Sequence, residues 1–85
     1  MKLFSPQKVI SDEGFTVQVA DRYTIEYVES TSHWVVEVDF GVNSTGLYRS
    51  TLKLDKGIAK SDENIVFDRI VKALSLMESN CEILS

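Results

Sequence analysis

The sequence predicts an α+β fold, an antiparallel β-meander of four to six strands with one amphipathic α-helix packed on its apolar face. Three observations indicate this class. Apolar and polar residues alternate with period two through most of residues 15–54, short polar turns separate the alternating segments, and helical spacing of apolar residues begins only near residue 61. Short connections favour antiparallel neighbours, and no spacing typical of a parallel βαβ unit is present.

The first strands are expected as a hairpin. Residues 15–20 alternate between apolar and polar side chains, residues 12–14 before them form a turn, and residues 9–10 suggest a short earlier strand. Residues 21–22 make a two-residue break, after which residues 23–29 alternate again and pair back on the preceding strand. The expected buried side of this second strand consists of Tyr23, Ile25 and Tyr27.

The clearest apolar face belongs to the strand that follows the polar loop at residues 30–32. Its inward side is expected to consist of Trp34, Val36, Val38 and Phe40. Glycine and asparagine mark residues 41–46 as a loop, and residues 47–54 form the next strand. One side of that strand is expected to carry Tyr48, Ser50, Leu52 and Leu54.

One helix is expected after the connector at residues 55–60. Ser61 is the expected N-cap, because its hydroxyl accepts from an unpaired amide of the first turn, and the two acidic residues after it complement the helix dipole. The apolar stripe that would cover the sheet consists of Val66, Phe67, Ile70, Val71, Leu74 and Met77. Asn80 is expected to end the helix, and residues 81–84 to form a short final strand.

Residues 1–85 are expected to form a single α+β domain in the cytoplasm. A chain of 85 residues leaves no room for a second core, and 44% hydrophobic with 26% charged residues is typical of an ordered globular protein. Cys81 is the only cysteine, which excludes an internal disulfide and fits a reducing compartment. The N-terminus lacks the apolar stretch of a signal peptide, and no run approaches the roughly twenty apolar residues that a bilayer requires, so we expect no membrane partner.

Negative charge is concentrated in the first half of the chain. The net charge is −4; residues 1–40 carry three basic and seven acidic side chains, whereas residues 41–85 carry six of each. If the apolar residues of adjacent strands share one face, then Glu26, Glu37 and Asp39 share the other, which one helix cannot also cover. An acidic face argues against direct contact with nucleic acid and favours a basic protein partner.

Other interpretations of these residues are weaker. The carboxylates also suit simple solvation, and they lack the spacing of a calcium loop, so no metal and no cofactor is expected. A nucleophilic pair of His33 and Cys81 would make the chain a small hydrolase, but the lone cysteine is more typical of a packed side chain. The sequence has no phosphate-binding loop and no other catalytic motif, so we expect no catalytic residues and no enzyme.

Five stretches within residues 20–84 carry a family resemblance. They are residues 23–27, 34–38, 50–54, 61–70 and 82–84. In their order and pattern they resemble small immunity proteins of bacterial toxin–immunity systems, including those of contact-dependent growth inhibition. The resemblance implies a cytoplasmic protein without catalytic activity that binds the toxin domain of its own system, commonly a nuclease, and blocks its active site or substrate path. Such toxins are often basic.

The sequence therefore favours an immunity protein that binds and neutralises a basic cognate toxin domain by covering its active site. The charge of the toxin-binding surface is expected to come from Glu26, Glu37 and Asp39. Its periphery is expected to include Glu29, Tyr48 and Arg49. The free protein would be a monomer or a weak dimer. The alternative is a nucleic-acid mimic from a phage or mobile element that inhibits a DNA-binding protein of the host.

Overall fold

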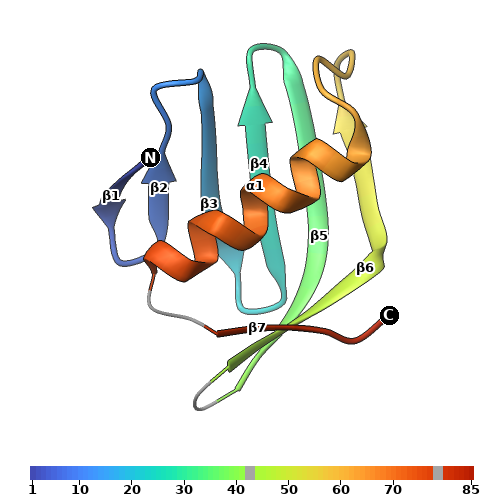
Figure 1. Cartoon of the computed structure of the whole chain (residues 1–85). Helices are drawn as coiled ribbons and strands as arrows, with labels where there is room; N and C mark the ends of the chain where they lie inside the picture. Colours follow the sequence, from blue (N-terminus) through green and yellow to red (C-terminus); the bar gives the residue numbers. More distant parts are fainter. Residues whose placement is uncertain (42–43, 78–79) are drawn as a thin grey trace.

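The structure, a computed structural model, describes residues 1–41, 44–77 and 80–85. In these residues one curled sheet of seven strands carries one helix on one of its faces (Figure 1). The strands are β1 (Lys2–Ser5), β2 (Lys8–Ile10), β3 (Phe15–Asp21), β4 (Thr24–Glu29), β5 (Ser32–Phe40), β6 (Ser44–Lys56) and β7 (Asn80–Ile83). The helix, α1 (Glu63–Leu76), lies between β6 and β7 in the sequence.

Each strand pairs with its neighbours in the sequence, so the order across the sheet is β1-β2-β3-β4-β5-β6-β7. The strands from β1 to β6 pair antiparallel, which confirms the meander. β7 pairs with β6 in parallel, because α1 carries the chain back across the sheet before β7 begins (Figure 1). The expected number of four to six strands is therefore wrong, since the described residues form seven, and the last of them departs from the antiparallel pattern.

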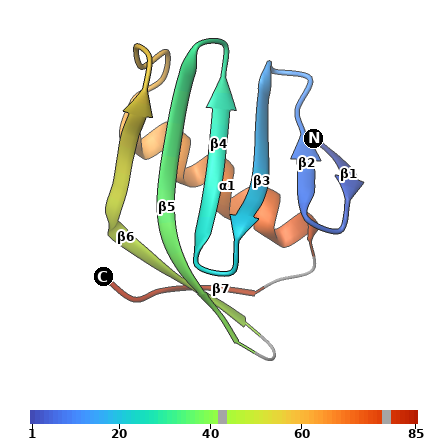
Figure 2. The same cartoon turned by 180° about the vertical axis from the view of Figure 1, so that it is seen from behind.

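The side of the sheet that faces α1, which we call the inner face, holds the core. Its buried apolar residues are Val9, Phe15, Val17, Ile25, Tyr27, Trp34, Val36, Val38, Leu47 and Leu52, and the helix adds Val66, Phe67, Ile70, Ala73 and Leu74. Figure 1 shows α1 crossing this face obliquely, and Figure 2 shows the opposite face, which we call the outer face and which no described element covers. The expected apolar stripe of the helix is confirmed, with Val71 and Met77 partly buried at its margin.

Two aromatic residues that were expected in the core lie at its edge. Tyr23 is 61% exposed, because it belongs to the turn between β3 and β4 and the strand begins only at Thr24. The Asp21 carboxylate accepts a hydrogen bond from the Tyr23 amide at 2.8 Å and fixes this turn. Phe40 is 38% exposed because it is the last residue of β5.

A bulge in β6 overturns the expected face of that strand. Val35 and Glu37 lie two residues apart on β5, whereas their partners on β6, Lys53 and Tyr48, lie five apart. The extra residues reverse the alternation, so Leu52 is buried while Tyr48 points to the outer face. The buried positions of β6 are Thr45, Gly46, Leu47 and Leu52, while Ser50 and Leu54 are exposed.

The side chain of Thr51 closes this bulge. Its hydroxyl accepts a hydrogen bond from the Glu37 amide at 2.8 Å and donates one to the Tyr48 carbonyl at 2.6 Å. The bulge is thus held on both sides by a single hydroxyl. Alternation in the sequence gives no sign of it.

The ends of the helix also differ from expectation. Asp62 rather than Ser61 is the N-cap, and its carboxylate accepts from the Ile65 amide at 3.0 Å. Ser61 instead donates its hydroxyl to Glu29. The helix ends at Leu76, and Asn80 begins β7, so the expected final strand is confirmed although Asn80 does not end the helix. Of the expected loop at residues 41–46, the last three residues belong to β6, and residues 42–43 lie outside the described residues.

Candidate functional site

The outer face carries the three carboxylates that the alternation predicted for it. Glu26 of β4 pairs with Val35 of β5, and Glu37 and Asp39 follow Val35 at alternate positions along β5. Because directly paired residues and alternate residues of a strand share a face, all three side chains lie on the side away from α1. Their surroundings, however, differ.

Glu26 interacts with neighbours inside the molecule. Gln18 Nε2 on β3 donates to Glu26 Oε1 at 2.8 Å, and His33 Nε2 on β5 lies 3.0 Å from Glu26 Oε2. The side chain is half-buried between these two groups. Glu26 is therefore less available to a partner than an exposed carboxylate would be.

Glu37 and Asp39 are exposed, and a third carboxylate joins them from the C-terminal strand. Gly46 of β6 pairs with Asp39 on one side and with Glu82 of β7 on the other. Glu82 therefore shares the outer face with Asp39. Within the described part of the chain, none of the three takes part in an ion pair. We call Glu37, Asp39 and Glu82 the acidic end.

An apolar side chain lies among these carboxylates. Leu84 packs over Gly46 so closely that a Cβ atom at position 46 would collide with Leu84 Cδ1. Leu84 is 46% exposed, and Tyr48, which pairs with Glu37, is half-buried on the same face. Protein interfaces commonly combine aromatic or aliphatic anchors with a charged rim. The acidic end, with Tyr48 and Leu84, has this composition.

Lysines also lie on the outer face. Strand pairing places Lys8, Lys53 and Lys56 on it, opposite outward residues of β3 and β5. The bulge of β6 leaves a hollow of about 460 Å³ in this face, with Glu37 and Lys53 both among its lining residues. The face is therefore not uniformly acidic, as the sequence suggested, because lysines of β2 and β6 share it with the carboxylates.

Glu29 lies on the inner face and is not part of the acidic end. Along β4 it shares a face with Tyr27, whereas Glu26 is on the opposite face. Its side chain is 15% exposed. Its Oε1 accepts hydrogen bonds from the hydroxyls of Tyr27 and Ser61, both at 2.9 Å, and its Oε2 accepts from Arg69 Nη1 at 3.2 Å. Glu29 thus belongs to a polar cluster beside α1 rather than to the periphery of an outer-face interface.

Arg69 is the centre of this cluster, which we call the inner cluster: Tyr27, Glu29, Ser61 and Arg69. Arg69 Nη1 also donates to the Tyr27 hydroxyl at 2.8 Å, and its guanidinium carbon lies 4.6 Å from the centre of the Phe15 ring. Burial by itself raises the pKa of Glu29, but the hydrogen bonds from its three donors outweigh burial and hold that pKa below its ordinary value. The charges of the inner cluster therefore satisfy each other.

Arg49 also lies on the inner side, at the start of α1. Its Nη1 donates to Glu63 Oε1 at 2.8 Å, its Nη2 donates to Asn64 Oδ1 at 2.9 Å, and its guanidinium carbon lies 4.9 Å from the centre of the Phe67 ring. Among the three peripheral residues expected from the sequence, Tyr48 alone lies on the outer face.

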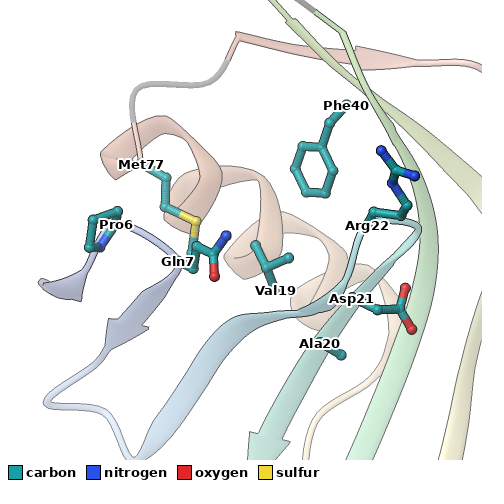
Figure 3. Close-up of a pocket in the computed structure, with 8 residues that line it drawn as sticks. All are labelled: Pro6, Gln7, Val19, Ala20, Asp21, Arg22, Phe40 and Met77. Atoms are coloured by element: carbon teal, nitrogen blue, oxygen red, sulfur yellow. The ribbon is translucent and has the colours of Figure 1, made fainter.

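A hollow of about 420 Å³ opens at the C-terminal end of α1 (Figure 3). Its lining residues are Pro6, Gln7, Val19, Ala20, Asp21, Arg22, Phe40 and Met77. Figure 3 shows that they come from the turn before β2, the end of β3 and the turn that follows it, the end of β5 and the C-cap of α1. Among the described residues of this lining there is no histidine, no thiol and no pair of carboxylates.

The structure separates His33 from Cys81. Thr45 pairs with both Phe40 and Cys81, and His33 lies seven residues from Phe40 along β5, a rise of about 23 Å. Burial also raises the pKa of the Cys81 thiol, which disfavours the reactive thiolate. This geometry does not support a nucleophilic pair.

No group of three or more His, Cys, Asp or Glu side chains in residues 1–41, 44–77 and 80–85 is arranged to hold a metal ion. Within the same ranges, no helix combines the length and the apolar character needed to cross a membrane.

Glu82 and Leu84 are the members of this site that sequence reasoning missed. Glu82 belongs to the final strand and Leu84 follows it, and alternation within a strand does not reveal which other strand it pairs with. The one available signal was Gly46, because a glycine within a strand often marks a place where another part of the chain approaches closely. That signal predicts a contact without naming the partner.

Comparisons of the chain with protein-family models, with curated proteins and with solved structures found no match. The function is therefore inferred from the geometry and chemistry of the outer face.

Proposed function

We propose that this chain is an immunity-type inhibitor that binds a basic cognate toxin domain through the acidic end of its outer face. The observation that carries the proposal is the exposed trio of Glu37, Asp39 and Glu82 around Leu84, on a face that no described element covers. Carboxylates without an internal basic partner attract a cationic surface and speed its association.

The spacing of the trio suits a surface that normally holds phosphates. Glu37 and Asp39 are separated by about 7 Å along β5, and Asp39 and Glu82 by about 10 Å across β6. A nuclease domain presents basic side chains to its nucleic acid, and these can bind carboxylates held on a sheet instead. When the carboxylates occupy these basic side chains, nucleic acid cannot reach them, and the inhibitor needs no catalytic activity.

The lysines of the outer face make the proposed contact directional. A uniformly basic partner surface would be repelled by Lys53 and Lys56, so the partner is expected to set its basic patch against the acidic end alone. Such repulsion at the wrong orientation contributes to specificity. Tyr48 and Leu84 would supply the desolvated centre of the interface.

The proposal is tested by affinity capture from the source cell, followed by titration calorimetry with the captured protein. A basic protein is expected, with an affinity that falls as salt rises. The pair Glu37→Lys and Asp39→Lys should weaken binding at least about 100-fold, because close interfacial charge pairs contribute about 1.5 kcal/mol or more each. Activity of the captured protein should be lost at one equivalent of this chain.

A matched control separates the acidic end from net charge. Asp12→Lys with Asp55→Lys changes the net charge equally at exposed positions outside the acidic end and should alter affinity only a fewfold. Equal losses in the two double variants would assign the effect to overall charge, and no loss in either would remove the acidic end from the interface. If the captured protein is instead a DNA-binding protein of the host, the nucleic-acid-mimic alternative replaces the toxin.

A further inference from the structure

β1 is an edge strand of the sheet. In the strand order it has β2 as its one neighbour, and all of its residues, Lys2–Ser5, are exposed. About half of the N–H and C=O groups of an edge strand point away from the sheet and are available to another strand. The edge is therefore a template for backbone pairing.

Exposed apolar side chains gather at the same edge. Met1, Leu3, Phe4 and Ile10, on or beside β1 and β2, are between 42% and 59% exposed. A hollow of about 360 Å³ is lined by Leu3, Phe4 and Ile10 together with Lys2 and Asp12. Grouped exposed apolar residues commonly mark an interface.

The strand is complementary to itself. If two copies of β1 pair antiparallel about a two-fold axis at Leu3, each Leu3 lies opposite the other, and each Lys2 lies opposite a Phe4. The two Lys2 ammonium groups are then far apart, and each meets an aromatic ring. A contact of the same kind exists within one chain, where Lys8 Nζ lies 5.3 Å from the centre of the Phe4 ring.

We infer that β1 pairs with β1 of a second copy of this chain, joining two sheets edge to edge in a symmetric dimer. The contact is short, because the pairing of β1 with β2 shifts between Leu3 and Ser5 and Pro6 follows the strand. A bulge and a proline stop further pairing at an edge. The interface is therefore smaller than the roughly 800 Å² per partner of stable complexes, and the dimer dissociates readily on dilution.

This dimer goes beyond the proposed function and does not depend on it. β1 is the first strand in the order, whereas the acidic end lies on β5 and β7, so pairing at β1 uses none of its residues. A dimer of this kind binds two partner domains at once.

Analytical ultracentrifugation of the purified chain over a wide concentration range tests the inference without any partner protein. The wild-type mass should rise towards twice that of one chain at the highest concentrations. Leu3→Asp should weaken self-association at least about tenfold, because two carboxylates would then lie directly opposite each other. The control Ile58→Asp makes the same change at a position that is 80% exposed and away from β1, and it should dimerise like the wild type.

Mixing two variants tests the register. Leu3→Asp and Leu3→Lys should each remain monomeric alone, and an equimolar mixture should recover dimers, because unlike charges then meet across the two-fold axis. Thermal unfolding followed by circular dichroism shows that each variant is folded. A wild type that stays monomeric, a Leu3→Asp variant that dimerises normally, a mixture that stays monomeric, or growth into larger species would each overturn the inference.

Discussion

Glu29 and Glu37 lie on adjacent strands and end up on opposite faces of the same sheet. Glu29 is held on the inner face by two hydroxyls and a guanidinium, with its pKa lowered by those hydrogen bonds. Glu37 is exposed on the outer face, and its carboxylate has no ion-pair partner among the described residues. One carboxylate stabilises the fold, and the other is free to meet a partner.

The difference shows that a count of acidic residues does not locate a binding surface. Each face carries carboxylates, but Glu29 in the inner cluster is satisfied by Arg69, Tyr27 and Ser61. Exposed charges without internal partners contribute more to the field outside the molecule than charges that are paired. Mutations in the two regions should therefore have opposite signatures, a loss of stability in one and a loss of binding in the other.

The largest effect on stability is expected from Arg69→Met, which keeps the apolar stem and removes the charge. Glu29 would be left largely buried without its basic partner, so unfolding in urea should become easier by about 2–3 kcal/mol. Arg49→Met is the matched control, because Arg49 pairs with the exposed Glu63, and it should lose at most about 1 kcal/mol. Equal losses in the two variants would mean that the inner cluster has no special role.

The second effect concerns the backbone beside the inner cluster. Gly57 has φ +80°, and a Cβ atom there would collide with the carbonyl of Thr31, in the turn that follows Glu29. Gly57→Ala should destabilise the chain by about 2 kcal/mol or more. Gly14 has φ +92° with nothing within 4 Å of a Cβ atom, so Gly14→Ala should lose only about 1 kcal/mol. Similar losses in chemical denaturation would contradict the close packing at Gly57.

A smaller effect is expected from pH. Because the folded-state pKa of Glu29 lies below its ordinary value of 4.5, its contribution to stability is complete above that pH and is lost as the pH falls through the lowered folded pKa. Glu29→Gln should flatten this part of the stability curve, measured by urea unfolding between neutral and strongly acid pH. A wild-type curve that the Glu29 variant does not alter would contradict the assignment.

The smallest effect on stability is expected at the acidic end itself. Glu37→Gln should change the free energy of unfolding by less than about 0.5 kcal/mol, because the carboxylate is exposed and without an ion pair. Thermal unfolding of the isolated chain measures this. A larger loss would show that Glu37 serves the fold, and its proposed role in binding would need another explanation.

The parts of the fold that alternation governs were predictable. The faces of β3, β4 and β5, and the stripe of α1, follow directly from the periods of the sequence. The bulge of β6 was not predictable, because it depends on a hydrogen bond that the Glu37 amide of β5 donates to the Thr51 hydroxyl. The acidic end was predictable only in part, since Glu82 reaches it through a parallel pairing that local pattern does not encode.

The same limit explains the residues that were misplaced. Glu29 lies three residues after Glu26 on β4, so alternation places the two side chains on opposite faces. Its charge nevertheless led to its being expected at the periphery of the outer face. Arg49 lies within the bulge, where alternation no longer indicates a face. In both cases the charge of the residue does not indicate its face of the sheet, which depends on the path of the strand.

We propose that the acidic end is the surface that meets the partner. The most direct test is a titration of the isotope-labelled chain with the captured partner, followed by nuclear magnetic resonance of the backbone amides. We predict that the largest changes in amide chemical shift fall on the segments around Glu37, Asp39, Tyr48 and Glu82, and that the amides of α1 and β1 change little. Shifts concentrated on α1 or on the hollow at its C-terminal end would contradict it.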